Sequence, residues 1–147
     1  MMKQHLFMAL AVMLFAAPAV HAQVSITEPW VRATVPEQKT TGAFMKITSP
    51  VDAKLVDVRT TLAGRAEIHE MAMIGDTMKM RQISNLPLPA GATVELKPGG
   101  FHVMLFELTV QAKEGNIVPL TLVIEAGGKQ ETVEVNAVVR PLNKPAH

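Results

Sequence analysis

The sequence contains no cysteine among its 147 residues. Disulfide bonds are therefore excluded, so the fold has to be held together by its hydrophobic core, and any metal site has to be built without thiolate ligands. A blue-copper electron-transfer site of the usual kind is excluded as well, because it needs a cysteine ligand. We also expect no lipid anchor, since no cysteine follows the apolar N-terminal run.

Aromatic residues and clustered charges are also scarce. After residue 22 the aromatic side chains are Trp30, Phe44, Phe101 and Phe106, which we expect in the core and which form no ladder for sugars or single-stranded nucleic acid. Setting Lys3 aside leaves 13 of the 14 basic residues, which balance the 13 acidic ones without forming a basic stretch. This argues against nucleic acid and anionic membranes as partners. The sequence shows no triad, paired-acid or zinc-protease motif, so we do not expect an enzyme.

The first 22 residues are typical of a secretory signal peptide. Lys3 precedes an apolar run over residues 6–20, and Val20-His21-Ala22 places small residues where a signal peptidase cuts. The run has 15 residues and contains Pro18, whereas about 18 or more apolar residues are needed to span a bilayer. We therefore expect export to the periplasm, with the signal peptide cleaved after Ala22.

This cleavage site sets the expected domain organisation. Residues 23–140 would form one β-sandwich domain, followed by a short flexible tail at 141–147. Mass spectrometry of the exported protein should find Gln23 as its first residue. An exported protein that retains residues 1–22 would contradict the prediction.

Short β-prone segments separated by Gly and Pro turn signals make up most of the remaining chain, and no long amphipathic helix pattern appears. This alternation predicts an all-β sandwich or barrel, which we expect to be monomeric. The expected strands cover residues 24–34, 42–48, 54–60, 67–73, 78–84, 93–96, 102–107, 118–125 and 131–139.

Histidine and methionine recur together at two places, residues 69–71 and 102–104, each with the pattern His-x-Met. Because residues i and i+2 of a strand point to the same face, each segment places an imidazole beside a thioether. Phe101, Val103 and Leu105 would then point to the opposite face and fill the core.

A β-hairpin is expected next to the first of these segments, with a two-residue turn at Gly75-Asp76. This turn gives the cross-strand pairs His69–Gln82, Met71–Met80 and Met73–Met78. Met80 would lie diagonal to His69, at about 7–8 Å between Cα atoms, within reach of a long side chain. A one-residue slip would turn Met80 to the other face. We expect Met73 and Met78 mainly to pack.

Thioether and imidazole donors together suit Cu(I), whereas hard cations prefer carboxylate oxygen and zinc is rarely bound by thioethers. Such donors are neutral, so acid would release the metal through the imidazoles alone. Met71 points parallel to His69, and we expect it to be an auxiliary sulfur instead of a primary ligand. On residue types alone, a methionine stripe that only fills the core is an equally open interpretation.

The spacing of four residues carries a family resemblance. His69, Met80, His102 and Met104 follow the pattern His-x10-Met-x21-His-x-Met, which resembles the signature of the periplasmic copper chaperone family PCu(A)C. Further similarity lies in residues 29–34, 41–45, 67–71, 79–81 and 98–105. The resemblance implies a cupredoxin-like Greek-key β-sandwich that holds one Cu(I) ion with these four side chains near one end.

The resemblance also implies partners. Copper would be delivered towards the binuclear copper centre of cytochrome c oxidase, so its copper-accepting subunit, a Sco-type thioredoxin-fold protein or both would receive it. Glu37 and Ser49 stand where the family suggests Gly and Asn. Some relatives have a C-terminal extension rich in His and Met, of which only His147 is present here, so we expect no second, Cu(II) site.

Two alternative functions stay open. One is a copper buffer or detoxification protein without a dedicated client, and the other is a metal-free Ig-like interaction module. The ligand spacing argues against the interaction module, but it does not separate a chaperone from a buffer.

Overall fold

The computed structural model describes residues 23–141. The expected signal peptide at residues 1–22 lies outside these residues, as do residues 142–147 of the expected tail, including His147. The described part consists of ten strands and contains no helix that is long and apolar enough to cross a membrane. The strands are β1 (Ser25–Arg32), β2 (Thr40–Thr48), β3 (Ala53–Arg59), β4 (Ala63–Ile74), β5 (Thr77–Gln82), β6 (Leu86–Leu88), β7 (Thr93–Leu96), β8 (His102–Leu108), β9 (Ile117–Ala126) and β10 (Lys129–Arg140).

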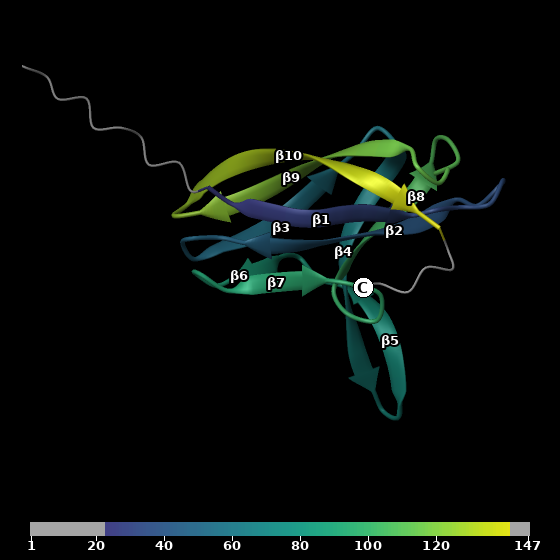
Figure 1. The fold of residues 1–147 in the computed structure, drawn as a ribbon. Coiled ribbons are helices and arrows are strands. Elements are labelled where there is room, and N and C mark those ends of the chain that lie inside the picture. The colour runs from purple at the N-terminus through teal and green to yellow at the C-terminus, as the bar shows by residue number, and fades with distance from the viewer. Residues whose placement is uncertain (1–22, 142–147) are drawn as a thin grey trace, which may run out of the picture.

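The strands form one hydrogen-bonded path in the order β5-β4-β8-β2-β1-β10-β9-β3-β6, and β7 pairs with β2. Neighbours in space are often distant in sequence, as in the antiparallel pairs β2–β8 and β3–β9. β1 and β10 are the exception to the antiparallel pattern, since they run parallel. The path curls so that β3 and β4 contact each other. The fold is the cupredoxin-like Greek-key β-sandwich that the sequence predicted (Figure 1).

The core lies between the layers and is built from alternate residues of the strands. Val31, Ile47, Leu105 and Leu122 are fully buried, and each such side chain stabilises the fold by about 1.5–3 kcal/mol relative to an exposed position. On β8 the alternation sends Val103 and Leu105 into the core. The other face of β8 is thereby left to His102, Met104 and Phe106.

The aromatic predictions are confirmed only in part. Trp30 and Phe44 are buried and stack with ring centroids 4.5 Å apart. The prediction that Phe101 fills the core is wrong, because its side chain is 36% exposed. Phe101 comes before β8 and pairs with Leu96 through an isolated bridge, so the alternation of β8 does not govern it. Phe106 is half-buried under the Arg65 guanidinium, 4.3 Å from the ring centroid.

The strand boundaries differ from the predicted ones mainly at two places. β6 was not predicted, because three residues that include Pro87 carry little periodic signal. β4 begins at Ala63, four residues before the predicted start, and pairs with β8 from there onwards.

The two unusual loop residues have structural explanations. Glu37 adopts φ of 71°, the left-handed conformation that favours glycine. Ser49 is fully buried, and its hydroxyl donates to the Val51 carbonyl at 2.6 Å and accepts from the Val51 amide at 3.3 Å. A serine can therefore close this turn where an asparagine was expected.

Candidate metal centre

The β4–β5 hairpin has the predicted register and extends away from the body of the sandwich (Figure 1). Its two-residue turn is Gly75-Asp76, and Gly75 adopts φ of 61°, as the first position of a type II′ turn requires. The cross-strand pairs are His69–Gln82, Met71–Met80 and Met73–Met78. β5 is the edge strand of the sheet and is exposed along its whole length.

The second His-x-Met segment lies next to the first. β8 pairs with β4 on the side away from β5, and His69 stands directly opposite His102. The two imidazole rings have centroids 5.5 Å apart, and both side chains are buried. Residues 69 and 102, which are 33 positions apart in sequence, thus become neighbours in the sheet.

Each imidazole uses one nitrogen for the protein and leaves the other free. His69 Nε2 lies 2.7 Å from Glu67 Oε2, and His102 Nδ1 lies 2.9 Å from the Gly100 carbonyl. His69 Nδ1 and His102 Nε2 are buried without a hydrogen-bond partner. A ring nitrogen that donates to a carboxylate or carbonyl fixes the neutral tautomer in which the other nitrogen offers a lone pair, as in many metal sites.

These orphan nitrogens need an explanation, because an unpaired buried polar atom costs about 1–3 kcal/mol. Among residues 23–141, these two atoms are the buried side-chain nitrogens or oxygens that lack a hydrogen-bond partner. Two such atoms on adjacent rings, both with the lone pair that a metal requires, fit a site that is completed by a bound ion.

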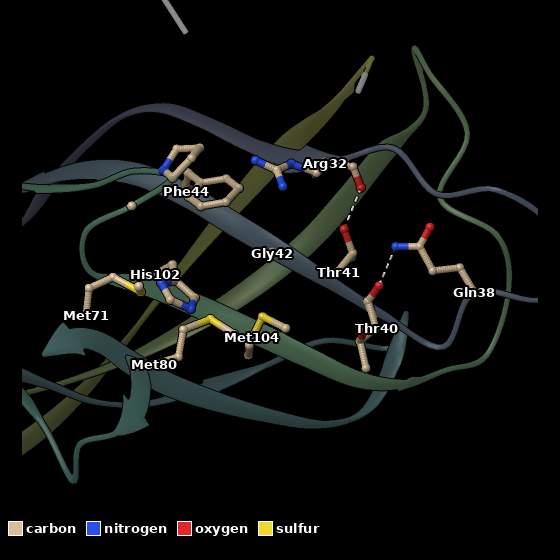
Figure 2. A pocket seen from close by; sticks show the side chains of 12 residues that line it. Arg32, Gln38, Thr40, Thr41, Gly42, Phe44, Met71, Met80, His102 and Met104 are labelled. Atoms are coloured by element: carbon tan, nitrogen blue, oxygen red, sulfur yellow. Dashed lines mark hydrogen bonds between the residues drawn. The ribbon is translucent and has the colours of Figure 1, made fainter. Parts of the chain in front are cut away.

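A pocket of about 380 Å³ adjoins the rings and contains the sulfur donors. Met71, Met80, His102 and Met104 line it (Figure 2). His69 is adjacent but does not line the pocket, because its ring turns towards Glu67 and Phe106. The structure therefore brings three of the four predicted ligands, Met80, His102 and Met104, to one cavity. The fourth, His69, lies next to His102.

Gly42 keeps the pocket open on the β2 side. It stands opposite Met104, and a Cβ atom at this position would lie 2.8 Å from the ring of Phe44. Phe44 is buried and its ring centroid lies 6.5 Å from that of His102. The close approach that only glycine allows holds an aromatic wall beside the imidazole.

The electrostatics of the site favour a soft ion of low charge. The imidazole and thioether donors are neutral, and the carboxylate of Glu67 is paired with Arg65. In the described part of the chain no group of three or more His, Cys, Asp or Glu side chains could hold a metal ion.

Sequence reasoning missed Glu67, which orients His69. The available signal was its position two residues before His69, on the same face of one strand. The prediction that Met73 and Met78 pack is wrong: their side chains are 62% and 50% exposed. Both lie close to the turn of the β4–β5 hairpin. That hairpin extends away from the body of the sandwich (Figure 1), so no core is available to them.

Residues 24–139 match the sequence family described as LpqE-like. A curated relative, Lxx21020 of Leifsonia xyli subsp. xyli, is named as a candidate lipoprotein and is 28% identical over 100 residues. The match covers 67% of the present chain and 60% of that relative.

Solved structures show the same fold. The apo PCuAC domain from PmoF1 has a TM-score of 0.67 at 25% identity, over 82% of this chain and 97% of that domain. The copper-bound PCuAC domain from PmoF2 has a TM-score of 0.66 at 22% identity, over 82% and 96%, a likeness of fold alone. The solution structure of CuI-DR1885 from Deinococcus radiodurans has a TM-score of 0.62 at 28% identity, over 86% and 85%.

Proposed function

The chain belongs to the LpqE-like, PCuAC-type family, and we propose that it binds one Cu(I) ion with His69, Met80, His102 and Met104 and passes it on as a periplasmic metallochaperone. The observation that supports this most strongly is the pair of buried, unpartnered nitrogens, His69 Nδ1 and His102 Nε2, on adjacent rings. The sulfur donors lie in the adjoining pocket.

The donor chemistry selects the oxidation state. Two imidazoles and two thioethers form a neutral, soft set, which favours Cu(I) over Cu(II) and over zinc. Copper is the cargo and not a resident cofactor, and its site lies at the sheet edge, where Met80 is 53% exposed. A buried pair of nitrogens would hold the ion while an exposed sulfur lets an acceptor begin ligand exchange.

The relatives support copper as the ion, since DR1885, which is 28% identical to this chain, is described in its CuI form. We propose that the chain acts after export from the cytoplasm and is a binding protein and not an enzyme. Its acceptor would be the copper-accepting subunit of cytochrome c oxidase or a Sco-type thioredoxin-fold protein. Transfer of Cu(I) to either purified acceptor would separate this role from that of a copper buffer.

Titration of the reduced protein with Cu(I) should show one tightly bound ion per chain, with little competition from Zn²⁺. X-ray absorption of the loaded protein should show mixed nitrogen and sulfur ligation, because the nearby carboxylate of Glu67 is already bound to Arg65 and His69. A ligand shell dominated by oxygen would overturn the assignment.

A further inference from the structure

The outer end of the β4–β5 hairpin carries a second pair of thioethers that the proposed site does not use. Met73 and Met78 stand directly opposite each other and form the next cross-strand pair on the same face beyond Met71 and Met80. Both outer side chains are more exposed than is usual for methionine, at 62% and 50%.

All four methionines share one face of the hairpin, because cross-strand partners and residues two apart point the same way. The charged residues of the two strands beyond His69 are on the opposite face, where Arg81 donates to Glu70 at 2.7 Å and Lys79 stands opposite Ala72. Asp76 lies in the turn itself. Between the pocket and the turn, the methionine face therefore carries no charged residue, and sulfur is its only type of soft donor.

The spacing suits movement of one ion between the pairs. Directly opposed residues have Cβ atoms about 4.5–5.5 Å apart, so two flexible thioethers can share one ion. Successive pairs on one face are about 6.8 Å apart along a strand. The outer pair thus lies one step beyond the pair that lines the pocket.

We propose that Met73 and Met78 form a second, weaker Cu(I) site at the hairpin tip, through which the ion enters and leaves the pocket. This inference rests on the proposed function of the inner site. To move outwards, the ion exchanges its bonds to His69, His102, Met80 and Met104 one at a time for bonds to the thioethers of Met73 and Met78. Copper stays Cu(I) in every step, so no oxidant or reductant is needed.

The proposed site can be observed directly with protein carrying ¹³C-labelled methionine methyl groups, titrated with Cu(I). The first equivalent should shift the Met80 and Met104 signals, and the second should shift those of Met73 and Met78 together. If the outer signals stay still throughout the second equivalent, there is no site at the tip.

The transfer role is tested with the double variant Met73→Leu/Met78→Leu, which keeps the apolar tip but removes its sulfur. We expect the affinity for the first Cu(I) to stay within about twofold, while the rate of Cu(I) transfer to a chelator falls about fivefold or more. The matched control is Ile74→Leu/Thr77→Val, a cross-strand pair at the same tip on the opposite face, which should transfer at the wild-type rate.

The results also separate the two proposals. A wild-type chain that binds no Cu(I) would overturn both of them. A chain that fills the inner site normally, but whose double leucine variant transfers as fast as the wild type, would overturn only the transfer site.

Discussion

Replacing His102 with leucine is expected to weaken Cu(I) binding by more than about a hundredfold. Mutation of a residue that only hydrogen-bonds to a metal ligand already lowers metal affinity by about 10–100-fold, and loss of the ligand itself should cost more. The same change should leave the copper-free protein nearly as stable as the wild type. His102 is 5% exposed, and its Nε2 has no partner. An unpaired buried nitrogen costs about 1–3 kcal/mol of stability, and leucine removes this cost. Leucine also loses the hydrogen bond to the Gly100 carbonyl, worth about 0.5–1.5 kcal/mol, so the two effects largely offset each other.

Two measurements are needed for this prediction. Competition against a Cu(I) chelator gives the affinity, and thermal unfolding with and without copper gives the stability. The apo midpoint should change by only a few degrees, corresponding to about 1 kcal/mol for a domain of this size. The loaded wild-type protein should gain stability from the bound ion, and His102→Leu should lose that gain.

A core residue should show the opposite result and serves as the control. Leu105 is fully buried on the other face of β8, and Leu105→Ala should destabilise the apo protein by about 2–5 kcal/mol. Any of this variant that remains folded should still bind Cu(I) as the wild type does. If His102→Leu instead unfolds the apo protein, or binds Cu(I) normally, then His102 is a structural core histidine.

The hairpin could be predicted in detail because two short-range rules determine it. A two-residue turn at Gly75-Asp76 fixes the register, and the period of two fixes the faces. The pairs Met71–Met80 and Met73–Met78 follow from these rules and are present in the structure. The family resemblance supplied the long-range information, namely that His69 and His102 meet.

The features that were not predicted depend on tertiary placement. Period two shows which residues share a face, but not whether that face is covered, so the exposure of Met73 and Met78 was missed. Glu67 was missed because its role depends on the orientation of the His69 ring, which the spacing does not give. Phe101 was misplaced because it comes before the first residue of β8.

Met80→Leu is expected to weaken Cu(I) binding by about tenfold or more, equivalent to about 1.4 kcal/mol. Met71→Leu should cost much less, although both thioethers line the pocket. Met71 is two residues from His69 on one strand, so the two side chains point parallel. Met80 stands opposite Met71 and therefore diagonal to His69, from where a flexible side chain can converge on the same ion.

The fold gives each of these variants a simple interpretation. β5 is exposed along its length and Met80 is 53% exposed, so leucine at position 80 removes a sulfur without disturbing the core. Titration of both variants against one Cu(I) chelator measures the two losses on the same scale. In the proposed site two nitrogens and two sulfurs would already satisfy Cu(I), so a third thioether should add little at equilibrium. Equal losses for Met71→Leu and Met80→Leu would show that His69 and Met71 act as a matched pair with His102 and Met104, and that the diagonal geometry does not select the ligand.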